Sequence, residues 1–150
     1  MISDSTKVLI VDDDLADTYL LHDTLQKFGV QSIKSRVTGE DAVKYIVGWP
    51  PFQGRRLPDV IFIDLKMRGI DGFQLIASIK ANPLSSDIPL IVFSGSKDSF
   101  DKNRAMALGA KAYYQKTNEA DKLKAMVETV LTVDVFAGRW MTGVKLFSFR

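Results

Sequence analysis

Residues that can bind a metal ion and a phosphoryl group stand at the ends of several short apolar runs in this sequence. They are Asp12, Asp13, Asp64, Ser94 and Lys116. Carboxylates that converge repel one another unless a cation compensates them, and Mg²⁺ prefers a few carboxylate oxygens together with water. A metal ion, a lysine and a small hydroxyl residue around one aspartate suit the transfer of a phosphoryl group to that aspartate. This chemistry requires a fold that brings all five residues together.

Each of these residues also has an ordinary structural explanation. Aspartate and serine are common in turns and at the first position of helices, and Asp14 is predicted to be the N-cap of the first helix. One such residue alone would indicate a turn or a cap. The full set, with each member at the end of a strand-like run, is better explained by a shared site.

The elements that must position these residues follow from the hydrophobic pattern. Apolar runs that predict buried strands are Lys7–Val11, Val60–Ile63, Leu90–Phe93 and, more weakly, Ala112–Tyr114, while Ser32–Val37 alternates like an edge strand. Helical patterns separate these runs. Their apolar stripes are Leu21, Leu25 and Phe28; Phe73, Ile76 and Ile79; Ala105 and Leu108; and Leu123, Val127, Val130 and Leu131.

The ends of the helices carry further signals. Thr38 is predicted to cap a second helix that runs to Ile46, and Asn118 is predicted to cap the fifth helix. Strands that alternate with helices predict a doubly wound α/β fold, in which a parallel sheet carries helices on both faces. In such sheets the site lies beyond the carboxyl ends of the strands, where the polar residues above are found.

Composition excludes several classes of protein. The chain has 150 residues, of which 46% are hydrophobic and 25% charged, so it is neither disordered nor fibrous. Cysteine is absent and His22 is the single histidine, which excludes disulfides and thiolate or histidine metal sites. A formal charge of +2, with scattered basic residues, argues against direct binding of nucleic acid. Without a signal sequence or a long apolar run, the chain is expected to be cytoplasmic and not membrane-bound.

Four segments together resemble a known family. They are Val8–Asp14 (VLIVDDD), Asp59–Gly72 (DVIFIDLKMRGIDG), Ile88–Gly95 (IPLIVFSG) and Gly109–Lys116 (GAKAYYQK). Over about residues 7–132 the sequence resembles the receiver domain of bacterial two-component response regulators. The resemblance implies a flavodoxin-like (βα)5 fold with strand order 2-1-3-4-5.

The resemblance also implies a role for each site residue. Asp64 would be the phosphoacceptor with Ser94 and Lys116 beside it, Ser94 and Tyr113 would form the switch, and Asp12, Asp13, Asp64 and the backbone carbonyl of Lys66 would bind Mg²⁺. The protein would take a phosphoryl group from a sensor histidine kinase or a phosphotransfer protein and act on a downstream protein target. It would catalyse its own phosphotransfer and dephosphorylation without being a turnover enzyme, and a homodimer is left open.

Two alternatives stay open at this point. One is a degenerate receiver that binds proteins as a scaffold, independently of phosphorylation. The other is a phosphohydrolase with an aspartate nucleophile, which needs a second aspartate two residues after the first. Lys66 occupies that place in this sequence, which weakens the second alternative.

The sequence departs from the family pattern in several places. Arg68 and Thr117 stand where the family commonly has proline, and the loop Trp49–Leu57 is longer than a minimal receiver needs. These features are similar to stand-alone receivers that pair with phytochrome-type kinases. Residues 1–132 are expected to form the receiver domain, and 133–150 an apolar extension without an output domain. We expect that extension, which includes Trp140, Met141, Phe147 and Phe149, to pack on the domain or in a dimer.

Overall fold

A single parallel sheet forms the centre of the molecule. The computed structural model describes residues 6–48, 54 and 56–135. The strands of these residues are β1 Lys7–Val11, β2 Ser32–Arg36, β3 Val60–Ile63, β4 Leu90–Ser94 and β5 Ala112–Gln115. Their order in the sheet is β2-β1-β3-β4-β5, and every neighbouring pair is parallel. The predicted doubly wound, flavodoxin-like architecture is therefore confirmed.

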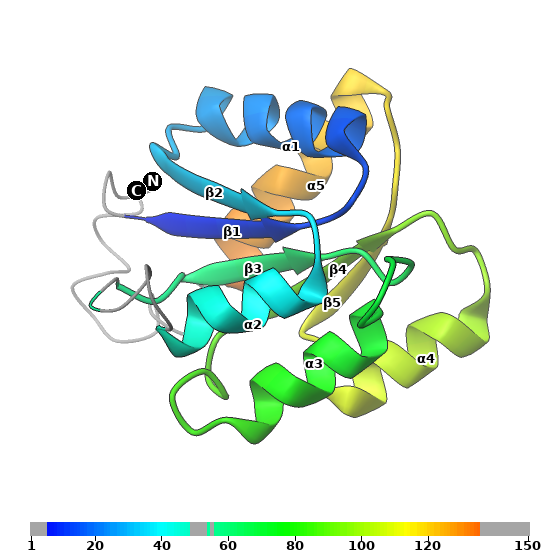
Figure 1. The fold of residues 1–150 in the computed structure, drawn as a ribbon. Coiled ribbons are helices and arrows are strands. Elements are labelled where there is room, and N and C mark those ends of the chain that lie inside the picture. Colours follow the sequence, from blue (N-terminus) through cyan, green and yellow to red (C-terminus); the bar gives the residue numbers. More distant parts are fainter. Residues whose placement is uncertain (1–5, 49–53, 55, 136–150) are drawn as a thin grey trace.

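Helices cover both faces of this sheet. They are α1 Leu15–Lys27, α2 Gly39–Val47, α3 Gly72–Ala81, α4 Ser99–Leu108 and α5 Ala120–Thr129, the last continued by a π-helical turn, η1 Val130–Asp134. Helices α1 and α5 lie on one face, and α2, α3 and α4 lie on the other (Figure 1). Within the described ranges, none of the helices is both long and apolar enough to cross a membrane.

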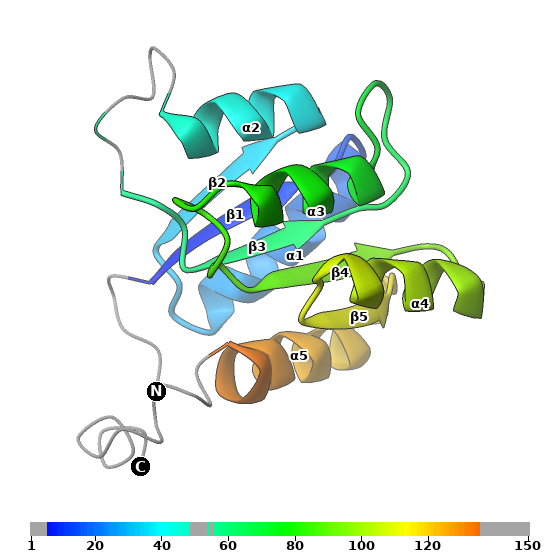
Figure 2. The ribbon, with the colours of Figure 1, turned by 90° about the horizontal axis from the view of Figure 1, so that it is seen from below.

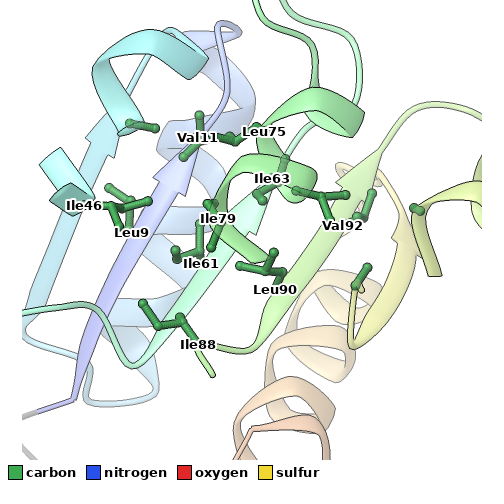
Figure 3. Close-up of a cluster of buried hydrophobic side chains, with 14 of the residues drawn as sticks. Leu9, Val11, Ile46, Ile61, Ile63, Leu75, Ile79, Ile88, Leu90 and Val92 are labelled. Carbon is green, nitrogen blue, oxygen red and sulfur yellow. The ribbon is translucent and has the colours of Figure 1, made fainter. Parts of the chain in front are cut away.

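Two apolar clusters, one on each face, hold the helices against the sheet. Side chains alternate along a strand, so Leu9 and Val11 face α2 and α3 while Val8 and Ile10 face α1 and α5. Figure 3 shows the first cluster, in which Leu75 from α3 packs over the strands. Strands buried on both faces need apolar residues at every position, which explains the continuous runs in the sequence.

The edge strand β2 lacks this double burial. Its residues are half-buried or exposed, in agreement with the alternating pattern predicted for Ser32–Val37. Strand β1 next to it is buried at all five positions. The contrast follows from position, because an edge strand has only one neighbour in the sheet.

Most helix ends lie where the sequence places them. Asp14 caps α1 by accepting a hydrogen bond from the Asp17 N–H, and Thr38 caps α2 through the Asp41 N–H. The predicted cap of the fifth helix by Asn118 is wrong. The N-cap is Glu119, one residue later than predicted; its side chain makes no capping hydrogen bond, and its N–H donates to the Thr117 hydroxyl at 3.1 Å.

Candidate functional site

The backbone ladder of the sheet sets the positions of the two buried aspartates. The Asp12 N–H donates to the carbonyl of Arg36 on β2 at 3.1 Å, and the Asp64 N–H donates to that of Val11 on β1 at 3.0 Å. Both residues follow their strands directly, so their side chains project from the carboxyl edge of the sheet. The loops that enter α3 and α4 leave from this same edge (Figure 2). Both aspartates are buried.

Asp13 completes a group of three carboxylates. One carboxylate oxygen from each of Asp12, Asp13 and Asp64 lies within 4.8 Å of the others. Burial and the charge of Asp64 raise the pKa of Asp12 to about 6, although Lys116 and the Asp14 N–H lower it in part. Such an all-oxygen, anionic group fits a hard divalent cation of the Mg²⁺ class. The predicted metal ligands with side-chain oxygens are thus brought together.

Lys116 lies over this group. Its Nζ is 2.8 Å from Oδ2 of Asp12, 2.8 Å from Oδ2 of Asp17 and 3.3 Å from Oδ2 of Asp64. Burial lowers the pKa of Lys116, but its hydrogen bonds to Asp12 and Asp17 and the charges of Asp12 and Asp64 outweigh burial and raise the pKa above its usual value. The ammonium group at this edge of the sheet therefore stays protonated and positively charged.

Ser94 is the last residue of β4 and is fully buried at 1% exposure. Its carbonyl oxygen accepts a 2.7 Å hydrogen bond from the Lys116 N–H, which ties the ends of β4 and β5 together. Its hydroxyl oxygen accepts from the Ser96 N–H at 3.3 Å. The Tyr113 hydroxyl donates to the Ser96 carbonyl at 2.8 Å, so Ser94 and Tyr113 are linked through one residue.

The two tyrosines of β5 face opposite sides of the sheet. Tyr113 packs against the cluster under α2, α3 and α4, and Tyr114 packs against the cluster under α1 and α5. The Tyr114 hydroxyl donates to the carboxylate of Asp134 in η1. This opposite placement agrees with the sequence prediction, because alternate residues of a strand point to alternate faces.

An open cleft adjoins the carboxylates. It has a volume of about 490 Å³ and is lined by Asp13, Leu65, Lys66, Met67, Arg68, Asp71, Phe73 and Asp101. Lys66, whose backbone carbonyl is a predicted metal ligand, is exposed and lines this cleft together with Asp13.

Sequence reasoning missed two residues of the site. Asp17 lies in the first turn of α1 and contacts Lys116, although it was not singled out. Its residue type gave no signal, because acidic residues are common in the first turn of a helix. Ser96 links Ser94 to Tyr113 through backbone atoms, which its residue type does not reveal.

Comparison with known proteins identifies the family. The response regulator receiver domain family matches residues 8–128. The chain belongs to this family. This receiver domain is 30% identical over 129 residues to a probable chemotaxis protein CheY of Rhizobium etli, covering 86% of this chain and 95% of that protein. It is also 30% identical over 136 residues to the protein PilG of Pseudomonas aeruginosa, covering 88% of this chain and 95% of that one.

A solved structure of a phytochrome response regulator has the same fold. The receiver domain superposes on the phosphorylated cyanobacterial phytochrome response regulator RcpA with a TM-score of 0.78 and 25% identity. The match covers 85% of this chain and 94% of the RcpA chain. The predicted similarity to receivers associated with phytochromes is confirmed by this neighbour.

Proposed function

We propose that this receiver domain accepts a phosphoryl group on Asp64 from a sensor histidine kinase or phosphotransfer protein. The observation that carries the proposal is the position of the Lys116 Nζ, 3.3 Å from Oδ2 of Asp64, beside three carboxylates within 4.8 Å of one another. The solved neighbour RcpA is described as phosphorylated, which supports the same chemistry for this chain. The domain would act as a phosphoacceptor in the cytoplasm, not as a turnover enzyme.

In the proposed reaction, a carboxylate oxygen of Asp64 forms a bond to phosphorus as the bond from phosphorus to the donor's histidine nitrogen breaks. The electron pair of that bond leaves with the imidazole, which takes a proton from water. Charge on the transferred oxygens is stabilised by the Lys116 ammonium group, which lies within reach of Asp64. Burial of Asp64 strengthens this attraction because little water screens it.

The carboxylates of Asp12, Asp13 and Asp64, with the backbone carbonyl of Lys66, would hold Mg²⁺. The ion would supply positive charge to the phosphoryl oxygens. The described donor set fits this role because it is made only of oxygen atoms and is anionic.

Phosphorylation is proposed to alter a protein-interaction surface through Ser94 and Tyr113. A new phosphoryl group at Asp64 needs hydrogen-bond donors, and the Ser94 hydroxyl is a donor on the neighbouring strand. Movement of Ser94 toward Asp64 would weaken its contact with the Ser96 N–H and, through Ser96, the bond from Tyr113. The face formed by α4, β5 and α5 would change, and a downstream protein would bind to the altered face.

We keep residues 1–132 as the proposed receiver domain and 133–150 as its extension. Among the described residues, Val135 still packs against the cluster under α1 and α5, which supports an extension that lies close to the domain at its start. The predictions for the Trp49–Leu57 loop and for the tail with Trp140 and Phe147 fall largely outside the described residues.

The test is the intact mass of the protein after incubation with acetyl phosphate, with and without Mg²⁺. Wild-type protein is expected to gain one phosphoryl group only with Mg²⁺, and Asp64→Asn is expected to gain none. Asp87→Asn is the matched control, because Asp87 is exposed and precedes β4 at the opposite edge of the sheet. Absence of any gain in folded protein, also with a histidine kinase as donor, would favour the scaffold alternative.

A further inference from the structure

Asp17 shares the ammonium group on which the proposed function depends. Asp17 lies on α1, outside the group of three carboxylates, yet its Oδ2 is 2.8 Å from the Lys116 Nζ. That distance equals the distance from Lys116 to Asp12 and is shorter than the 3.3 Å to Asp64. The ammonium group therefore lies closer to the carboxylates of Asp12 and Asp17 than to the phosphoacceptor.

Three carboxylates surround the Lys116 ammonium group, and two of them, Asp17 and Asp64, accept hydrogen bonds from it. An ammonium group has three N–H donors and no acceptor, and three carboxylates surround this one. The Lys116 side chain is only 15% exposed, so water does little to replace a lost partner. A new acceptor at Asp64 therefore competes with these carboxylates for the ammonium group.

The carboxylate of Asp17 differs from those of Asp12 and Asp64 in two ways, its exposure and its place outside the metal-binding group. Its side chain is 34% exposed, against 5% for Asp12 and 9% for Asp64, so it can be hydrated after it loses the lysine. It is also the one carboxylate of the three around Lys116 that is not part of the group suited to a metal ion. Asp17 is thus suited to hold Lys116 before phosphorylation and to release it afterwards.

We propose that Asp17 is a positioning residue that competes with the incoming phosphoryl group for Lys116 and so limits the rate of phosphorylation at Asp64. This inference rests on the proposed function and adds a regulatory residue to its site. In it, the negative charge of Asp17 holds the ammonium group toward α1. Removal of that charge frees Lys116 to pair with the phosphoryl oxygens as they approach.

The alternative explanation is that Asp17 holds Lys116 in the orientation that phosphoryl transfer needs, without restraining it. The two explanations predict opposite results for two variants. Asp17→Asn removes the charge but keeps an oxygen acceptor, and Asp17→Ala removes both. Competition predicts that both variants are phosphorylated faster than wild type, whereas orientation predicts that Asp17→Ala is slower.

The experiment measures the initial rate of phosphorylation by acetyl phosphate with Mg²⁺ for wild type, Asp17→Asn and Asp17→Ala. Asp14→Asn is the control for a lost charge nearby, since asparagine also caps helices and Asp14 is exposed. We expect an increase of about threefold or more for both Asp17 variants, corresponding to roughly 0.7 kcal/mol in the barrier, and less than twofold for Asp14→Asn. An unchanged or lower rate in either Asp17 variant, or an equal increase in Asp14→Asn, would overturn the proposal.

A second readout needs neither donor nor metal. In metal-free protein the NMR signal of the Lys116 ammonium group is expected to shift in Asp17→Asn and to stay in place in Asp23→Asn, since Asp23 on the same helix pairs with Lys27 instead. If wild-type protein takes up no phosphoryl group at all, the proposed function fails, while this signal still tests the pairing of Asp17 with Lys116. An unshifted signal in Asp17→Asn would contradict that pairing.

Discussion

The Tyr113 hydroxyl donates a 2.8 Å hydrogen bond to the carbonyl oxygen of Ser96, two residues beyond the end of β4. The same Ser96 donates its N–H to the Ser94 hydroxyl oxygen and its own hydroxyl to Asp101 on α4 at 2.7 Å. One residue thus connects the site, the strand β5 and the helix α4. The tyrosine holds this loop in place from the neighbouring strand.

Tyr113→Phe is expected to lower the free energy of unfolding by about 1 kcal/mol, the usual net value of one intramolecular hydrogen bond. The ring keeps its packing, so the change isolates the bond to the Ser96 carbonyl. Urea unfolding measures it. Tyr19→Phe is the matched control, since Tyr19 is 70% exposed, and equal losses in both variants would contradict a special role for the Tyr113 hydroxyl.

Gly72 is expected to tolerate no side chain. A Cβ at this position would lie 2.4 Å from the Asp64 carbonyl oxygen and 2.5 Å from the Leu65 Cα, both of them backbone atoms that cannot move aside alone. Gly72→Ala should therefore lower the free energy of unfolding by about 3 kcal/mol, as expected for overpacking in a tight site. Gly95→Ala, where a Cβ would meet nothing within 4 Å, should change it by about 0.5 kcal/mol or less. Thermal unfolding of the two variants provides the comparison, and similar melting temperatures would refute it.

The pairing of Tyr114 with Asp134 predicts a loss of stability at high pH. Burial, the hydrogen bond to Asp134 and the charge of Asp134 raise the pKa of Tyr114 above its usual value. Above roughly pH 10 the unfolded chain releases this proton while the folded protein keeps it, so the free energy of unfolding falls as pH rises. Below that pH the contribution of Tyr114 is constant.

The free energy of unfolding, measured with urea at several values between roughly pH 8 and pH 11, checks this prediction. We expect a steeper decline for wild type than for Tyr114→Phe, which cannot titrate at this position. Lysine side chains also titrate in this range, but they are common to both proteins and cancel in the difference. Parallel declines would show that Tyr114 loses its proton equally easily in the folded and unfolded states.

The part of the site that sequence predicts best is the part built by strands. Asp12, Asp64 and Ser94 each stand at the end of a continuous apolar run, and parallel strands bring their carboxyl ends to one edge. Helical periodicity and caps such as Thr38 then place the helices between them. At these positions the hydrophobic pattern agrees with the topology of the sheet. A single sequence therefore indicates both the strands and the site at their ends.

The parts that sequence did not predict depend on contacts between elements. Asp17 looks like an ordinary acidic residue in the first turn of a helix, and only the folded arrangement of α1 beside α5 brings it to Lys116, which follows β5. The π-helical turn at Val130–Asp134 has the same apolar spacing as an α-helix, so periodicity does not separate the two. The predicted cap at Asn118 is wrong because α5 begins one residue later, after Glu119, whose N–H donates to the Thr117 hydroxyl.

Divalent metal is expected to stabilise the protein through Asp13. The carboxylates of Asp12, Asp13 and Asp64 lie within 4.8 Å of one another, and a cation that binds only the folded state raises its stability with concentration. At 100 times the dissociation constant of Mg²⁺, the increase in the free energy of unfolding should be about 2.7 kcal/mol.

Asp13→Asn should lose most of this increase, because a neutral amide binds a hard cation more weakly than a carboxylate does. Asp14→Asn is the neighbouring control, since Asp14 caps α1 and lies outside the carboxylate group. Each variant is compared with itself, with and without Mg²⁺, so any change in its basal stability cancels. Thermal unfolding with increasing Mg²⁺ gives the shift, and an equal shift in Asp13→Asn and wild type would place the metal elsewhere.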